Sequence, residues 1–93
     1  MNEITVNDAE DRQRFEARVD GVLAGVLTYT RTDGVAVYPH TKVQPEFEGR
    51  GIGGELARAA LDDARARGLR VNPVCPFVAD WIDKHPDYQG LVA

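Results

Sequence analysis

The sequence predicts one α/β domain, built from an antiparallel meander that is followed by a helix, a strand and a second helix. Two observations predict this fold class. Apolar and polar residues alternate through the first half of the 93-residue chain, and the apolar spacing changes to that of a helix near residue 52. A chain of this length has room for one modest core, so we expect residues 1–93 to form a single domain.

Four extended segments are predicted before the spacing changes, because short apolar alternations are typical of half-buried strands. They are expected around residues 4–6 and at residues 15–19, 22–30 and 35–43. Asp20 and Gly21 suit the two positive-φ positions of a type I′ hairpin. We therefore expect antiparallel hairpins, with the acidic residues 8–11 in a solvated loop.

Residues 53–67 are predicted to form one amphipathic helix, with charged residues on the side that faces away from the core. Its apolar side is expected to consist of Ile52, Leu56, Ala59, Ala60 and Ala64. Gly68 suits the left-handed position that ends many helices. A short strand at residues 69–74 and a second helix from Pro76 to a point before Pro86 should follow, with Trp81 in the core.

The charge and the composition exclude several function classes. Eleven basic residues against fifteen acidic ones give a net charge of -4, which argues against a nucleic-acid or anionic-membrane partner. No apolar run approaches the roughly 20 residues of a membrane span, and the first residues lack an apolar signal segment. His40, Cys75 and His85 are too few for a zinc set, so no metal site is predicted. We expect a cytoplasmic protein, either a monomer or a weak dimer.

A glycine-rich loop at residues 49–54 lies between a predicted strand and a predicted helix. The bare backbone N–H groups of such a loop face the positive end of the helix dipole, which favours an anion. Glycine permits both the close approach of a phosphate and unusual backbone angles. The loop therefore predicts a phosphate site, and the alternative is a turn without a ligand.

Two common phosphate motifs fit this loop poorly. A P-loop requires Lys and then Ser or Thr after its last glycine, whereas Glu55 and Leu56 follow here. The dinucleotide fingerprint G-x-G-x-x-G is matched by Gly49, Gly51 and Gly54, but no acidic residue follows about 20 positions later. The chain also lacks a second mononucleotide-binding half.

A third motif fits better, because residues 40–56 closely resemble the central motif of the GNAT acyltransferase superfamily. In that motif Arg or Gln, two residues, Gly, one residue and then Gly or Ala cradle the pyrophosphate of coenzyme A. Gly51 and Gly53 take the places of the two glycines, and Glu48 stands where the family usually has Arg or Gln. The resemblance covers most of the chain from Val22 onward. Over this range the chain is similar to a minimal, single-domain branch of the family.

The resemblance implies a GNAT-like fold, acetyl-CoA or coenzyme A as the cofactor, and transfer of the acetyl group to an unidentified amine. The cofactor-binding residues that it implies are Val43, Gln44, Gly49, Arg50, Gly51, Ile52, Gly53 and Gly54. The alternative is a non-catalytic acyl-CoA-binding or regulatory module, because the N-terminal helices that help form the acceptor site in larger members are missing. The tyrosine that those members commonly use as an acid is missing too: Ile82 takes roughly its place, and Tyr88 lies beyond Pro86.

Cys75 and His40 are the candidate catalytic residues. Cys75 precedes Pro76 at a predicted helix N-terminus, which lowers the pKa of a thiol, so it is a candidate nucleophile; the alternative is an inert buried cysteine. His40 is the candidate base, or else a structural hydrogen-bonding residue. Strict alternation along residues 35–43 puts His40 on the same face as Ala36, Tyr38 and Lys42, and we expect that face to line a cleft.

Overall fold

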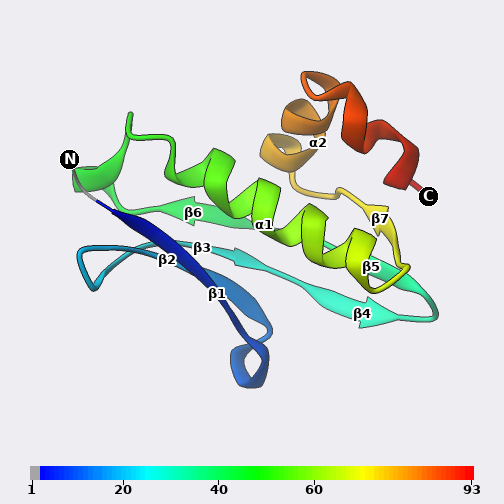
Figure 1. Ribbon diagram of the computed structural model, residues 1–93, viewed down its shortest axis with the longest axis horizontal. Coiled ribbons are helices and arrows are strands. Elements are labelled where there is room, and N and C mark those ends of the chain that lie inside the picture. The colour runs from blue at the N-terminus through cyan, green and yellow to red at the C-terminus, as the bar shows by residue number, and fades with distance from the viewer. Residues whose placement is uncertain (1–2) are drawn as a thin grey trace.

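Two small sheets and two helices make up the protein in a computed structural model, which describes residues 3–93 (Figure 1). The first sheet is antiparallel in the order β1-β2-β3-β6, with strands Ile4–Ala9, Arg14–Val19, Val22–Thr28 and Thr41–Val43. The second has the order β4-β5-β7, with strands Thr30–Thr32, Val35–Val37 and Arg70–Asn72, of which β5 and β7 are parallel. The helices are α1 at Ile52–Ala66 and α2 at Pro76–Asp83. Short 3-10 turns are η1 at Glu10–Arg12, η2 at Pro45–Phe47 and η3 at Pro86–Leu91.

The predicted meander and its first hairpin are confirmed. Strands β2 and β3 pair antiparallel around Asp20 and Gly21, whose φ angles of 51° and 85° are those of the predicted turn. The predicted strand at residues 22–30 is divided at Tyr29, and the predicted strand at residues 69–74 is shorter, because only Arg70–Asn72 pairs. The turn-forming residues were therefore better guides than the lengths of the apolar runs.

The predicted strand at residues 35–43 is interrupted, and the alternation expected along it is wrong. Ala36 and Tyr38 are buried beneath α1, where the Tyr38 hydroxyl donates to the carbonyl of Ala60 at 2.9 Å. Pro39 has no N–H to continue a ladder, so the chain pairs with β7 up to Tyr38 and only with β3 from His40 onward. The face predicted to line a cleft is thus core at one end and exposed at the other, where His40 lies.

Helix α1 covers the sheet and supplies much of the core (Figure 1). Its buried residues are Ile52, Leu56, Ala57, Ala60, Leu61 and Ala64. The helix begins one residue before the predicted position and ends one residue before it, and Ala59 is only half-buried. The apolar side is therefore turned slightly from the expected one, towards Ala57 and Leu61. Gly68, at φ 71°, follows the helix in the predicted left-handed conformation.

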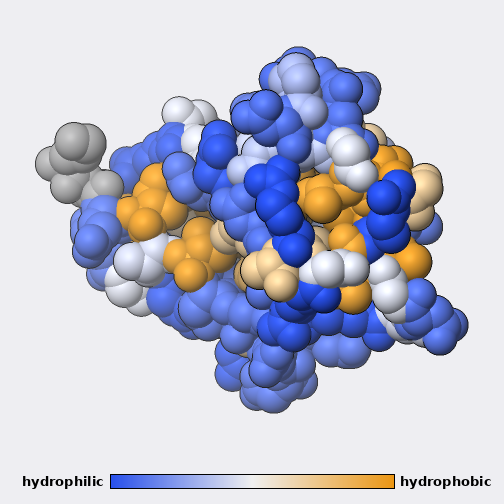
Figure 2. All heavy atoms as spheres, turned by 45° about the vertical axis from the view of Figure 1, so that its right-hand side comes forward, coloured by the Kyte–Doolittle hydropathy of each residue, from blue (hydrophilic) through white to orange (hydrophobic). Residues whose placement is uncertain are grey.

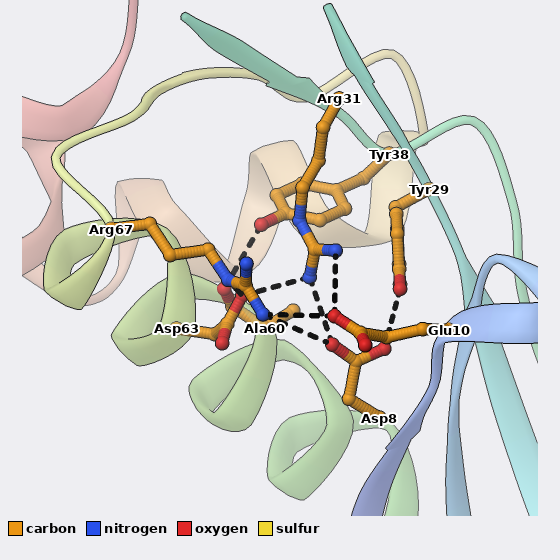
Figure 3. Close-up of polar contacts among 8 residues, drawn as sticks. All are labelled: Asp8, Glu10, Tyr29, Arg31, Tyr38, Ala60, Asp63 and Arg67. Carbon is orange, nitrogen blue, oxygen red and sulfur yellow. Dashed lines mark hydrogen bonds and ion pairs between the residues drawn. The ribbon is translucent and has the colours of Figure 1, made fainter.

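A polar network fastens the C-terminal half of α1 to the strands (Figure 3). Arg31 donates to Asp8 and to Asp63, at 2.9 Å in each case, and its guanidinium lies 4.0 Å from the centre of the Tyr29 ring. Arg67 adds a bond of 2.8 Å to Asp63. The prediction of a solvated acidic loop at residues 8–11 is wrong for Asp8, because β1 continues through this residue and its carboxylate binds Arg31, whereas Glu10 and Asp11 are exposed in η1. Burial and the bond to Asp8 raise the pKa of Tyr29 to about 12.

The last residues are packed against the domain. Tyr88 in η3 is buried, and Val92 forms a parallel bridge with Val71 of β7. Trp81 is core, as predicted, with 8% of its surface exposed.

No helix within residues 3–93 has the length and apolar character needed to cross a membrane. On the face shown in Figure 2 the surface is mostly hydrophilic, with apolar side chains gathered in two separate areas.

One carboxylate of β2, that of Glu16, is buried beneath three arginines. Glu16 is 2% exposed and accepts bonds from Arg14 at 2.8 Å, Arg12 at 3.1 Å and Arg18 at 3.0 Å. The bond from Arg14, opposed by burial and reinforced by Arg18 and Arg12, lowers the pKa of Glu16 from 4.5 to about 2. The ionised form of Glu16 is thus stabilised in the folded state.

We predict that Glu16→Gln lowers the free energy of unfolding by about 1 kcal/mol at pH 7, a modest value because the arginines are partly exposed to solvent. The folded pKa is below the unfolded one, so this contribution is present above pH 4.5 and is lost as the pH falls towards 2. Urea unfolding at a series of pH values should show the two proteins converging in acid. Glu46→Gln, at an exposed position, is the control, and a constant difference down to pH 2 would contradict the prediction.

Candidate functional site

A cavity of about 320 Å³ lies between the end of β6, the glycine loop and α2. It is lined by Val43, Phe47, Glu48, Gly49, Gly51, Ile52, Gly53, Gly54 and Phe77. The loop predicted to hold a phosphate is therefore one wall of a cavity. All the predicted cofactor-binding residues line it except Gln44 and Arg50. The backbone N–H of Gln44 already donates to the carbonyl of Ala24 at 2.8 Å.

The glycines of the loop fall into two groups, which differ in the physical reason why glycine occupies the position. Gly49 and Gly51 have φ angles of 83° and 79°, and an added Cβ would meet nothing within 4 Å at either one, so they are required by the backbone path. Gly53 and Gly54 lie inside α1 and face α2. A Cβ on Gly53 would lie 2.7 Å from the Phe77 ring, and one on Gly54 would lie 3.4 Å from Nε1 of Trp81. Sequence reasoning assigned all of them to the ligand, whereas Gly53 is also required for the approach of α2, and an alanine at Gly54 would be in ordinary contact with Trp81.

The first turn of α1 is open to an anion. Gly51 is the N-cap residue. No side chain accepts a hydrogen bond from the N–H groups of the first turn. Ile52, Gly53 and Gly54 of this turn line the cavity. The helix dipole favours negative charge there, whereas the Glu48 carboxylate on the same wall opposes it. The guanidinium of Arg50 lies 5.6 Å from the centre of the Phe47 ring, at the edge of the same wall.

Cys75 is the N-cap residue of α2 and is 5% exposed. Its Sγ lies 3.4 Å from Oγ1 of Thr41 on β6. Burial raises the pKa of the thiol, but hydrogen bonds from Thr41 and from the backbone N–H groups of Val78 and Phe77 outweigh it, so the pKa is below its ordinary value. Cys75 does not line the cavity; Thr41 lies about 7 Å along β6 from Val43, which does.

The predicted base His40 does not line the cavity, and neither do Tyr88 and Ile82, which were considered in connection with the missing acid. His40 is exposed between β5 and β6, and its carbonyl accepts from the N–H of Thr28 at 2.9 Å. Tyr88 donates to Asp62 at 2.7 Å, which raises the pKa of its hydroxyl, and Ile82 is buried. Within residues 3–93 no three His, Cys, Asp or Glu side chains gather closely enough to hold a metal ion.

Sequence reasoning missed two residues of the site, Thr41 and Phe77. Thr41 shares a face of β6 with Val43, so the two-residue period of a strand could have placed it beside the cavity. Phe77 precedes Trp81 by four residues, so helical spacing places both on one side of α2. Nothing in the spacing shows that Phe77 ends 42% exposed at a cavity while Trp81 is buried, because the difference depends on how α2 meets α1.

Comparison with known proteins gives a consistent picture. Residues 14–91 match the family described as GCN5-related N-acetyl-transferase. The protein NATD1 of Xenopus tropicalis is 31% identical over 90 residues, which are 95% of this chain and 83% of that protein. A GCN5-like protein from Staphylococcus aureus, solved by NMR, superposes with a TM-score of 0.71 at 25% identity, over 98% of this chain and 87% of that one.

A GNAT family acetyltransferase from Brucella melitensis, solved in complex with acetyl-CoA, superposes with a TM-score of 0.60. The match covers 78% of this chain and 55% of that one. At 23% identity it shows a shared fold. The present chain spans about half the length of that acetyltransferase.

We predict that Thr41→Val raises the pKa of Cys75, because the variant removes the hydroxyl that stabilises the thiolate and leaves the shape almost unchanged. The measurement is the rate of alkylation by iodoacetamide as a function of pH. Thr30→Val, which changes an exposed residue of β4, should leave the profile unaltered. The same midpoint in Thr41→Val and in the unaltered protein would show that this contact does not set the pKa.

Proposed function

Because this chain belongs to the GCN5-related N-acetyltransferase family, we propose that it binds acetyl-CoA in the cavity before α1 and transfers the acetyl group to an amine. The GNAT-like fold predicted from the sequence is confirmed by the family match and by the structural neighbours. The observation that carries the proposal is the uncapped first turn of α1, which opens into a cavity close to a thiol of lowered pKa.

Two parts of the site would hold the cofactor. The pyrophosphate would bind the backbone N–H groups of Gly51 to Gly54, where the helix dipole favours it. The pantetheine arm would follow the outer edge of β6, which has no strand partner because the sheet ends there. Gln44 donates to β3, and N–H groups of successive strand residues face alternate edges, so those of Thr41 and Val43 face that outer edge. The N–H of Thr41 already meets the Cys75 thiol, so an amide group of the arm would pair with that of Val43.

The arm placed in this way leads from the cavity towards Thr41 and Cys75. In the proposed first step the Cys75 thiolate attacks the thioester carbonyl, a bond from Sγ to the acetyl carbon forms, and the bond to the coenzyme A sulfur breaks. Coenzyme A leaves as a thiolate and takes a proton from water. In the second step the amine attacks the acetyl-cysteine, a C–N bond forms, the Cys75 thiolate is expelled, and the proton of the amine passes to solvent.

A direct route is the alternative within the same activity. In it His40 or a water takes the proton of the amine, which attacks the bound thioester without an enzyme intermediate. The exposed position of His40 would allow it to take a proton from an incoming acceptor. Cys75 distinguishes the two routes, because only the first requires a nucleophile from the chain.

A non-catalytic acyl-CoA-binding module is the second candidate function. The position of Tyr88 favours this function. The Tyr88 hydroxyl donates to Asp62, which raises its pKa, so this hydroxyl is not placed as an acid beside the cavity. Release of free thiol from acetyl-CoA in the presence of a panel of amines, above the hydrolysis background, would separate an enzyme from a module.

We predict that coenzyme A and acetyl-CoA raise the thermal midpoint, whereas ATP and NAD raise it much less. A ligand at 100 times its Kd that binds only the folded state stabilises a protein by about 2.7 kcal/mol. Glu48→Gln should increase the shift, because it removes a carboxylate from the wall of the anion site. Glu46→Gln, outside the cavity lining, is the matched control. Equal shifts with all four ligands, or none with coenzyme A, would refute the cofactor assignment.

We predict that incubation with acetyl-CoA leaves an acetyl group on the peptide that contains Cys75, and that coenzyme A protects this thiol from alkylation. Mass spectrometry after acid quenching is the measurement. Cys75→Ala should keep its affinity for coenzyme A and lose transfer activity. Full activity in Cys75→Ala would leave only the direct route, and alkylation of Cys75 that is indifferent to coenzyme A would place the thiol away from the cofactor.

A further inference from the structure

One largely buried side chain next to the cavity has a hydrogen-bond donor without a partner. Trp81 is 8% exposed, and its Nε1 makes no hydrogen bond to any residue within 3–93. A Cβ on Gly54 would lie 3.4 Å from Nε1, so this edge of the indole ring is directed at the first turn of α1. No fully buried side-chain N or O atom in the described chain lacks a partner, and Nε1 therefore reaches solvent at that point.

The faces of the Trp81 ring are already used. The imidazole of His85 stacks on it, with ring centres 3.7 Å apart and planes inclined by 11°. His85 is held there by a contact of 2.6 Å between its Nδ1 and the carbonyl of Trp81. Tyr88 meets the ring at an angle of 64° with centres 5.0 Å apart. What Trp81 still offers to a ligand is consequently the N–H edge beside Gly54.

A cation that makes no ion pair lies next to this edge. Arg58 follows Gly54 by four residues and so projects from the same side of α1, about 6 Å further along the axis. Its guanidinium lies 5.3 Å from the centre of the Trp81 ring, and its Nη1 donates to the Tyr88 hydroxyl in a long bond of 3.4 Å. Within residues 3–93 no carboxylate lies within ion-pair distance of Arg58, whereas the arginines of β2 and of the Asp8 network are paired.

Two carboxylates belong to the surroundings of Arg58, and neither lies within ion-pair distance of its guanidinium. Asp62 accepts the hydrogen bond of the Tyr88 hydroxyl at 2.7 Å, and Glu55 is exposed on α1. The indole N–H and the guanidinium therefore form a pair of hydrogen-bond donors, and the positive charge of the guanidinium makes no ion pair. It lies one helical turn beyond the N–H groups to which the pyrophosphate is assigned.

We propose that Trp81 Nε1 and Arg58 form a second anion subsite, which binds the 3′-phosphate of the adenosine end of coenzyme A. This assignment rests on the proposed function. Coenzyme A carries two separate anionic groups, the pyrophosphate and the ribose 3′-phosphate, which only a ribose unit separates. With the first at the start of α1, a donor pair one turn further along the same side is placed for the second. Arg58 would supply the charge and the indole N–H a fixed direction.

Gly54 is part of this subsite because it leaves the indole N–H uncovered. An alanine Cβ at this position would be in ordinary contact with Nε1, and alanine is favoured over glycine inside a helix. Gly54→Ala should therefore raise the thermal midpoint of the free protein while it weakens binding of the 3′-phosphate. A variant that gains stability and loses affinity cannot be explained by unfolding.

The test compares coenzyme A with 3′-dephospho-coenzyme A by titration calorimetry at one ionic strength. The unaltered protein should bind coenzyme A about tenfold more tightly, the effect of one or two charge-assisted hydrogen bonds. Arg58→Gln should lose most of this preference and keep the affinity for the dephosphorylated ligand. Arg65→Gln, with the same change of charge two turns further along α1, should retain the preference. Gly54→Ala and Trp81→Phe should reduce it.

The outcomes separate this inference from the proposed function. Equal affinity of the unaltered protein for the two ligands would overturn the subsite and leave the cofactor assignment intact. Binding of neither ligand would overturn both. An Arg58→Gln variant that loses the two ligands equally would show that Arg58 does not contact the 3′-phosphate, as would an equal loss of preference in Arg65→Gln. If Trp81→Phe fails to fold, Gly54→Ala tests the indole N–H by itself.

Discussion

The close approach of α1 to its neighbours is the constraint on which the rest of the structure depends. A Cβ on Gly25 would lie 2.9 Å from the carbonyl of Lys42 and 3.1 Å from Ile52, so a larger residue would push the start of α1 off the sheet. Gly53 permits the matching approach of Phe77 on α2. At the other end of the helix Arg31 joins Asp63 to β1. The open first turn is thus fixed from both sides, and its N–H groups need no rearrangement to meet a ligand.

An acidic chain that binds a polyanion must do so through local groups. The net charge is -4, and Glu48 lies on the wall of the cavity, so long-range attraction does not favour coenzyme A. Most arginines are committed to carboxylates: three surround Glu16, and Arg31 and Arg67 meet at Asp63. Backbone N–H groups, the helix dipole and the few uncommitted donors must then supply the binding energy. Such a site gains selectivity from geometry more than from charge, and the arrangement around Arg58 accords with that.

The sequence predicted the local structure well and the tertiary contacts poorly, for physical reasons. Periodicity located α1 to within one residue, and the positive-φ requirement of Asp20 and Gly21 located a hairpin, because both signals depend on neighbours along the chain. Alternation failed at residues 35–43, since Pro39 ends one pairing and a different strand supplies the next. The partners of Asp8 could not be found in this way, because Tyr29 and Arg31 are distant from it in sequence. The glycine loop that forms one wall of the cavity was predicted, but the contacts of Gly53 and Gly54 with α2 were not.

The two helical glycines connect the stability of the fold to its function. Glycine inside a helix costs roughly 0.5–1 kcal/mol relative to alanine, and two of them in one turn are a considerable cost for a domain of 93 residues. Packing explains Gly53, because a side chain there would meet Phe77 at 2.7 Å. It does not explain Gly54, where an alanine would fit at 3.4 Å from the indole. A residue that gives up helix stability without a steric need, and that keeps an unpaired N–H open beside an anion site, is better explained by a ligand than by the fold.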